Sequence, residues 1–339
     1  MKQDLLNLLN NVKEDTPTIE SERYLLIDGL NLFFRNFSAI NTVNSKGIHI
    51  GGLGGFLRSL GSLIHHTQPT QIIIVFDGSG SSNNRKNIIP EYKSSRNITR
   101  VTKHELFDNL EEEDESKIEQ IVRIIQYLKT LPVKVITLKK VEADDVIAFL
   151  SNKLPEKDSD RVFIVSSDKD YLQLINEQII VYRPIEKEFF TEDTVKNKFN
   201  LYPYNFIIYK TLLGDQSDSL PGIKGLGAKK LFKLFPELSD KKLSLDDIFE
   251  LSQERIKEHI IYARILSDIQ VLEDKYKIMD LSNPMIDDES KIKLLSLVKD
   301  ISLEYHPEEF IRMYREDQID GLIKNVEFWL KNNFQNLIQ

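Results

Sequence analysis

Short apolar runs alternate with stretches of helical spacing over roughly the first half of the chain. Each run is four or five residues long and closed by turn residues, which is typical of strands buried in a parallel sheet. Between the runs, apolar residues such as Leu53, Leu57 and Leu60 recur every three or four positions, which indicates helices. We expect strands at 24–27, 72–76, 133–137, 162–165 and 179–182. Strands that alternate with helices predict an α/β fold with a mainly parallel central sheet flanked by helices.

The pattern changes near residue 191, beyond which helical spacing predominates. We therefore divide the chain into an α/β domain and a helical part, with a short extension at each end. The expected divisions are an N-terminal helix and linker at 1–22, the α/β domain at 23–190, a helical domain at 191–280 and a C-terminal helical extension at 281–339.

Acidic residues follow the expected strands at the point where each strand ends. Asp28, Asp77 and Asp168 come after three apolar runs, and the segment VEADD at 141–145 follows a fourth. One such aspartate is an ordinary turn former or helix cap, and VEADD alone could be the acidic first turn of a helix. Because ligands of open α/β sheets bind at the carboxyl ends of the strands, several such acids predict one acidic crevice. We assign nine acids to it: Asp28, Asp77, Glu142, Asp144, Asp145, Asp168, Asp170, Asp215 and Asp218.

The composition limits what this crevice can bind. The chain has no cysteine and only six histidines, which are not spaced as metal ligands. Carboxylates alone suit hard cations, so we expect Mg²⁺, with Mn²⁺ as a substitute. So many acids predict two ions, about 4 Å apart, of the kind that clamp a phosphodiester during hydrolysis. A glycosidase needs only two carboxylates, and the DxDxDG spacing of a calcium loop is missing.

A basic segment follows the second of these aspartates. Residues 83–103 carry six cations against a single acid, Glu91, with Tyr92 in their midst. The six cations are Arg85, Lys86, Lys93, Arg96, Arg100 and Lys103. Cations interleaved with an aromatic ring suit single-stranded nucleic acid, although an ordinary basic surface loop is the alternative. The net charge of −8 becomes +1 once the nine assigned acids are set aside, so it does not exclude such a partner. We expect the acidic run at 111–115 to be a solvated helix face.

A glycine-rich turn lies in the helical part. The segment GDQSDSLPGIKGLGAKK at 214–230 leads into a lysine-bearing helix, where free backbone N–H groups can bind phosphate. The Gly-Lys-Ser/Thr spacing of a nucleotide-triphosphate loop is absent. We interpret 214–236 as a helix–hairpin–helix-type clamp for a phosphate backbone, against the alternative of a glycine turn with solvated lysines.

Six segments share the residues and the order of a known family. They are LLIDGLNLFFR (25–35), VFDG (75–78), RKNIIPEYKSSR (85–96), VEADDVIA (141–148), VSSDKDYLQL (165–174) and GDQSDSLPGIKGLGAKK (214–230). With them the chain resembles the structure-specific 5′-nucleases, which include flap endonucleases, phage 5′-exonucleases and the 5′-nuclease domain of bacterial DNA polymerase I. The resemblance implies a PIN-like catalytic domain with a helical arch at about 83–117, followed by a helical DNA-binding domain.

The resemblance also implies roles for single residues. The ligands of the first metal would be Asp28, Asp77, Glu142 and Asp144. The ligands of the second would be Asp145, Asp168, Asp170, Asp215 and Asp218. The catalytic contacts to the scissile phosphate would come from Lys93 and Arg96. The residues that stack on or steer the 5′ strand would be Arg35, Arg85, Lys86 and Tyr92. The residues that hold the duplex backbone would be Lys224, Gly225, Gly227, Lys229 and Lys230. In relatives this contact often includes a K⁺ ion.

These features predict a divalent-metal-dependent 5′-nuclease that hydrolyses phosphodiester bonds near the 5′ end of RNA primers or DNA flaps during replication. One alternative is a PIN-like endoribonuclease, which would not need the segment 214–230. The other is a non-catalytic DNA-junction binder, which a lost metal ligand would favour. We expect a monomer that acts on DNA or an RNA/DNA duplex, assisted by a single-stranded-DNA-binding protein or a sliding clamp. Without an apolar run of about 18 residues or a signal peptide, we expect no membrane contact and a cytoplasmic location.

Overall fold

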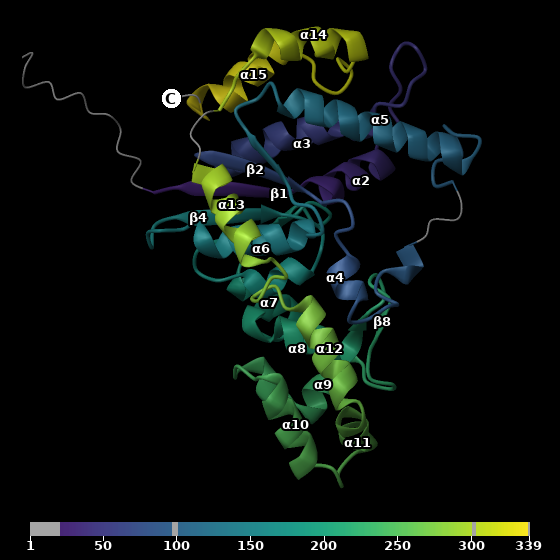
Figure 1. Cartoon of the computed structure of the whole chain (residues 1–339), viewed down its shortest axis with the longest axis vertical. Coiled ribbons are helices and arrows are strands. Elements are labelled where there is room, and N and C mark those ends of the chain that lie inside the picture. The colour runs from purple at the N-terminus through teal and green to yellow at the C-terminus, as the bar shows by residue number, and fades with distance from the viewer. Residues whose placement is uncertain (1–20, 97–100, 300–302, 338–339) are drawn as a thin grey trace, which may run out of the picture.

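A six-stranded sheet, in the order β3-β2-β1-β4-β5-β6, forms the centre of the molecule. The computed structural model describes residues 21–96, 101–299 and 303–337 of the chain, which Figure 1 shows as a whole. The strands are β1 (Arg23–Asp28), β2 (Gln71–Phe76), β3 (Lys134–Thr137), β4 (Arg161–Val165), β5 (Ile179–Arg183) and β6 (Glu188–Phe190). The first five are parallel, and β6 pairs antiparallel with β5. The mainly parallel sheet predicted from the apolar runs is confirmed, with β6 as an added edge strand.

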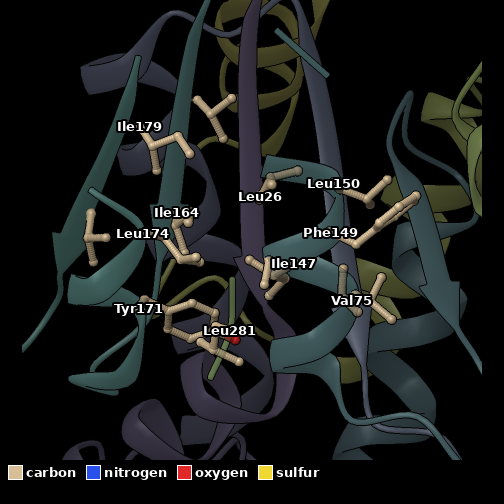
Figure 2. Close-up of a cluster of buried hydrophobic side chains, with 14 of the residues drawn as sticks. Leu26, Val75, Ile147, Phe149, Leu150, Ile164, Tyr171, Leu174, Ile179 and Leu281 are labelled. Atoms are coloured by element: carbon tan, nitrogen blue, oxygen red, sulfur yellow. The ribbon is translucent and has the colours of Figure 1, made fainter. Parts of the chain in front are cut away.

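Helices cover both faces of this sheet because successive residues of a strand point to opposite sides. One face packs on α2 (Gly29–Ala39), α3 (Gly51–Thr67) and α5 (Leu110–Leu128), and the other packs on α6 (Ala143–Lys153). Leu25 of β1 therefore belongs to the first core and its neighbour Leu26 to the second. In Figure 2, Leu26 and Ile164 from two strands lie in the second core together with Ile147 and Leu150 of α6.

A smaller core holds the helical part together. Its helices are α8 (Phe206–Leu213), α9 (Ala228–Leu234), α10 (Leu245–Glu254), α11 (Ile260–Ser267) and α12 (Ile269–Met279). The buried rings of Phe235 and Tyr262 meet edge to face in this core, with centroids 5.4 Å apart. The turn between α8 and α9 contains the short strands β7 (Gly214–Asp215) and β8 (Leu220–Pro221). In Figure 1, β8 of this turn lies close to α4 (Asn83–Lys86), at the end of the helical part that is nearer to the α/β domain.

The last helices of the chain return to the α/β domain. The helix α13 (Asp288–Lys299) packs on α6, and α15 (Val326–Phe334) packs on α3 together with α14 (Pro307–Asp317). The guanidinium of Arg123 in α5 holds α14 through Asp317, with Nε and Oδ2 2.7 Å apart. Figure 1 shows α14 and α15 at the end of the molecule opposite α10 and α11. Of the helices in the described residues, none is long and apolar enough to cross a membrane.

Candidate metal centre and nucleic-acid site

The carboxyl ends of the strands carry the acids of the predicted crevice. Asp28 ends β1 and caps α2, where it accepts a hydrogen bond from the N–H of Asn31 (3.0 Å). Asp77 follows β2 and accepts one from the N–H of Ala143 at the start of α6 (2.7 Å). Because β1 and β2 are parallel neighbours, their carboxyl ends lie at one edge of the sheet. A cavity of about 640 Å³ at this edge is lined by six of the nine assigned acids: Asp28, Asp77, Glu142, Asp144, Asp168 and Asp218.

Two acids of this cavity have raised pKa values, so their charged forms are destabilised in the protein alone. Burial and the charge of Asp77 raise the pKa of Asp28 to about 7. Burial and the charge of Asp144 raise the pKa of Glu142 to about 6, against the opposing charge of Arg85. One carboxylate oxygen of Glu142 is buried without a hydrogen-bond partner among the described residues. Such carboxylates are stabilised by a bound cation, so this donor set fits hard divalent ions.

A second group of acids adjoins this cavity. Carboxylate oxygens of Asp170, Asp215 and Asp218 lie within 4.8 Å of one another, and Asp218 lines the cavity as well. The ammonium group of Lys210 in α8 forms ion pairs with Asp170 and Asp215, at 2.6 Å from Asp215 Oδ2. Burial alone would raise the pKa of Asp215, but the charge of Lys210 lowers it to about 2. The ammonium group of Lys210 therefore lies next to these carboxylates. Because they already bind one cationic group, their oxygens also fit a metal ion.

Lys210 was not identified from the sequence. It lies in the otherwise apolar helix FIIYKTLL, ahead of Asp215, and its side chain is only 8% exposed. A buried lysine needs a counter-charge, so a lone lysine in an apolar helix beside an aspartate-rich turn is the signal that would have pointed to it.

Asp145 and Arg85 form a buried ion pair, and Arg85 also lies 3.1 Å from Glu142 Oε2 and 3.5 Å from Asp144 Oδ1. Both oxygens of Asp145 accept hydrogen bonds from the Arg85 guanidinium, at 2.6 and 3.1 Å, and Oδ1 also accepts the N–H of Met285 (2.9 Å). Arg85 is 2% exposed and donates its Nε–H to the carbonyl of Ile278 (2.8 Å). The expectation that Arg85 steers a 5′ strand does not fit this buried position. Asp145 likewise lies outside the group that lines the cavity.

Tyr92 and Lys93 both contact Glu142 at the edge of the cavity. The Tyr92 hydroxyl donates to Glu142 Oε2 (3.1 Å), and the Lys93 ammonium donates to the same oxygen (2.8 Å). The ring of Tyr92 is 2% exposed because it packs in the core of the helical part, so it offers no stacking surface here. Lys93 lines the cavity, as its expected contact with a phosphate requires. Arg96 ends a short 3₁₀ turn, and its side chain lies outside the described residues, as does Arg100.

The far end of the basic segment is anchored by a buried acid. Glu113 accepts hydrogen bonds from the N–H groups of Thr102 (2.6 Å) and Lys103 (3.2 Å) and pairs with Lys117 (2.9 Å). Burial opposes the charged form, yet these hydrogen bonds lower the pKa of Glu113 to about 2. The ammonium of Lys103 contacts the carbonyl oxygens of Ser38 (3.2 Å) and Ile40 (3.3 Å). The prediction that the whole acidic run 111–115 is solvated is therefore wrong at Glu113.

An exposed aromatic side chain beside the acids was not predicted. Phe34 of α2 is 44% exposed, Ile185 in the β5–β6 turn is 64% exposed, and both line the cavity. The neighbouring Arg35 donates from Nη2 to the carbonyl of Pro184 (2.5 Å), which ties α2 to the same turn. An exposed ring six positions after Asp28 on the first helix was the signal available in the sequence. A flat apolar surface here suits a nucleobase.

The glycine-rich turn presents its polar groups to solvent. Its members Lys224, Gly225, Gly227, Lys229 and Lys230 are all exposed, whereas the apolar Ile223 and Leu226 between them are buried and fix the turn. Gly225 has φ +81°, a conformation that favours glycine. Lys86, at the end of α4, is exposed too.

The family model of the 5′-3′ exonuclease, N-terminal resolvase-like domain matches residues 23–200, more than half of the chain. The chain belongs to this family. Among its relatives, the 5′-3′ exonuclease of Aquifex aeolicus is 36% identical over 205 residues, which cover 60% of this chain and 65% of that protein. The DNA polymerase I of Bacillus subtilis is 32% identical over 246 residues, which cover 71% of this chain and 26% of that protein.

The fold agrees with this assignment. A solved structure of the D15 flap endonuclease of bacteriophage T5, a pseudo-enzyme-product complex with DNA and metal ions, has a TM-score of 0.62 and 18% sequence identity. It covers 90% of this chain and all of the phage chain. A structure of the T5 5′-exonuclease with divalent zinc ions is equally similar, with a TM-score of 0.62. The predicted 5′-nuclease fold is therefore confirmed. The match to the curated relatives covers about two thirds of the exonuclease and about a quarter of the polymerase.

Proposed function

We propose that this protein is a structure-specific 5′-nuclease that uses two divalent cations to hydrolyse phosphodiester bonds near the 5′ end of a strand. The observation that carries the proposal is the meeting of six acids from separate segments of the chain in one cavity, with Lys93 at its edge. The relatives named 5′-3′ exonuclease and the T5 flap endonuclease bound to DNA and metal ions support the same reaction.

The acids divide into two donor groups. We place the first cation at Asp28, Asp77, Glu142 and Asp144, and the second at Asp168, Asp170, Asp215 and Asp218. Two Mg²⁺ ions bound there would supply an activated water and neutralise charge on the scissile phosphate. Mn²⁺ would satisfy the same oxygen donors. We leave Asp145 out of both groups, because it does not line the cavity and both of its oxygens accept hydrogen bonds from Arg85.

The remaining residues bind and orient the strand. Lys93 would donate a hydrogen bond to the scissile phosphate, exchanging its contact with Glu142 for one with the substrate. Phe34 and Ile185 would support the adjoining base, and Arg35 holds their two elements together. The exposed N–H groups of the glycine-rich turn would bind the backbone of the duplex at a distance from the cut, where a K⁺ ion is an additional candidate.

We infer that the substrate is a 5′ flap or a 5′ end on a duplex, including an RNA primer paired with DNA. The exposed glycine-rich turn favours this over a single-stranded RNA, which would leave the turn without a ligand. The test is cleavage of a labelled 5′-flap duplex, and of the flap strand alone as RNA, with Mg²⁺ and with EDTA. Flap cleavage that needs Mg²⁺ supports the proposal, whereas preferential cutting of the free RNA contradicts it.

Lys93 offers a separate test of the chemistry. In the Lys93→Ala variant, the charge that develops on the phosphate loses one donor, so single-turnover cleavage should slow by about a hundredfold. Binding of the flap duplex in EDTA should change much less. Lys86→Ala, which removes an exposed cation from the same segment, is the matched control. An unchanged rate for Lys93→Ala would exclude Lys93 from the reaction.

A further inference from the structure

The segment that carries Lys93 is joined to the turn that carries Asp218. The backbone N–H of Lys93 donates to the carbonyl of Asp218 (2.9 Å). Two residues further on, the N–H of Ser95 donates to Oγ of Ser219 (3.0 Å), and the two serine hydroxyls lie 2.7 Å apart. Three hydrogen bonds therefore connect two short segments that are more than 120 positions apart in the sequence.

Both sides of this junction adopt a rare backbone conformation. Lys93 has φ +58° and Ser219 has φ +61°, in the left-handed region that residues with a side chain seldom occupy. Such a conformation costs free energy and persists only where surrounding contacts determine it. At Lys93 it directs the backbone N–H to Asp218 while the ammonium group reaches Glu142 (2.8 Å).

We infer that Ser219 is a positioning residue for Lys93. The Ser219 hydroxyl does not line the cavity, but it can accept the N–H of Ser95 and share a second hydrogen bond with the Ser95 hydroxyl. These contacts hold the 93–95 segment at the edge of the cavity, so the Lys93 ammonium is placed before a strand arrives. The inference rests on the proposed function. It adds Ser219, which would not touch the substrate, as a residue that positions Lys93, which would.

Positioning by Ser219 gives the helical part a second role in the reaction, beside the proposed metal ligands Asp215 and Asp218. Lys93 comes from the α/β domain, and Ser219 lies in the turn between α8 and α9. The backbone bond between Lys93 and Asp218 remains when the Ser219 side chain is removed, so the loss should be partial. One or two hydrogen bonds to a semi-exposed segment correspond to roughly a three- to tenfold effect on rate.

The experiment compares Ser219→Gly with Ser219→Ala in single-turnover cleavage of a 5′-flap duplex. Glycine removes the hydroxyl and favours the left-handed backbone, whereas alanine removes the hydroxyl and keeps the strain. We expect both variants to be slower than the wild type by a similar factor of roughly three to ten. In a Lys93→Ala background, Ser219→Gly should have no further effect. The Mg²⁺ concentration that gives half-maximal rate should stay as in the wild type.

Three outcomes would overturn the inference. Ser219→Gly could cleave at the wild-type rate, which would show that the Ser219 hydroxyl is not needed to position Lys93. The loss could be the same with and without Lys93, or it could appear as a higher requirement for Mg²⁺, which would assign Ser219 to the placement of Asp218. A wild-type protein that fails to cut the flap would contradict the proposed function itself, and that result is distinct from all three.

Discussion

Acids at the two ends of the central sheet have pKa values that are shifted in opposite directions. At the amino end, Asp160 precedes β4 and accepts hydrogen bonds from the N–H groups of Glu22 (2.8 Å), Glu156 (2.9 Å) and Lys157 (2.9 Å). Burial opposes its charge, but these donors lower its pKa below the usual range. At the carboxyl end of the adjacent strand, Asp28 accepts one backbone N–H and the hydroxyls of Ser166 (3.2 Å) and Tyr171 (3.5 Å), yet desolvation and nearby carboxylates raise its pKa to about 7. Both acids lie next to a strand, but only the second has neighbouring carboxylates that destabilise its charged form, an effect that a bound cation would offset.

This difference separates structural acids from functional ones. A carboxylate with a structural role accepts hydrogen bonds from nearby backbone N–H groups, as Asp160 does. A carboxylate that binds a metal must keep oxygens available, so its charge is compensated only when the ion is present. Proximity to a strand end does not distinguish the two cases, whereas the number of backbone donors and of neighbouring carboxylates does.

The largest expected effect, on cleavage rate, comes from a comparison of two substitutions, one at each end of the central sheet. Asp144→Asn should reduce flap cleavage by about a thousandfold, because a neutral amide is a poor ligand for a divalent ion near the reacting phosphate. Asp160→Asn should lower the free energy of unfolding by about 1 to 3 kcal/mol, since an amide nitrogen would face backbone donors. Its folded fraction should still cleave at the wild-type rate. The measurements are single-turnover cleavage and urea unfolding of both variants; loss of activity in a stably folded Asp160→Asn would contradict the comparison.

A second effect concerns the free energy of unfolding without metal. The pKa of Asp28 rises from 3.8 to about 7 on folding. Between these two pH values, the folded state therefore binds more protons than the unfolded state. In EDTA, the contribution of Asp28 to stability is therefore full at low pH and is lost as the pH rises toward 7. Mg²⁺ at a hundred times its dissociation constant should restore about 2.7 kcal/mol, and more at pH 8 than at pH 5 because protons compete for the same oxygens.

Thermal unfolding with Mg²⁺ and with EDTA, at pH 5 and pH 8, measures this effect. Asp28→Asn should reduce the difference between the two pH values, whereas Asp160→Asn should keep it. A wild-type protein in EDTA that becomes more stable between pH 5 and pH 8 would show that the acids of the cavity are already neutralised by the protein.

The smallest effect concerns Glu113, which belongs with the structural acids. Its pKa falls from 4.5 to about 2 on folding, so its contribution to stability is present above pH 4.5 and is lost as the pH falls toward 2. Glu113→Gln should cost about 1 to 2 kcal/mol at pH 7 and much less at pH 2.5, because most of what the Glu113 charge contributes to stability is lost between these pH values. Urea unfolding at the two pH values tests this. An equal cost at both would mean that packing, and not charge, is what Glu113 contributes.

The sequence predicted the strands and the acids that follow them because both depend on local pattern. The sequence did not predict which of two adjacent side chains contacts which other residue in the folded protein. Asp144 and Asp145 are adjacent in the first turn of α6 and point about 100° apart, so Asp144 lines the cavity, 3.5 Å from Arg85, while Asp145 lies outside it with both oxygens on Arg85. Tyr92 was expected at a nucleobase and is buried, because the helical part packs against it. Such contacts join segments far apart in the chain, and residue type and spacing do not specify them.

The return of the last helices to the α/β domain has a consequence for how the protein folds. The helices α14 and α15 complete the layer that covers α3, and the bond from Arg123 to Asp317 spans 194 positions. Closing so long a loop is entropically costly and slow compared with forming neighbouring contacts. During synthesis, the side of α3 that α14 and α15 cover would stay exposed until the residues of α15 have left the ribosome, after the intervening helices have been made. Nascent chains of increasing length should therefore gain protease resistance in the helical part before they gain it around α3.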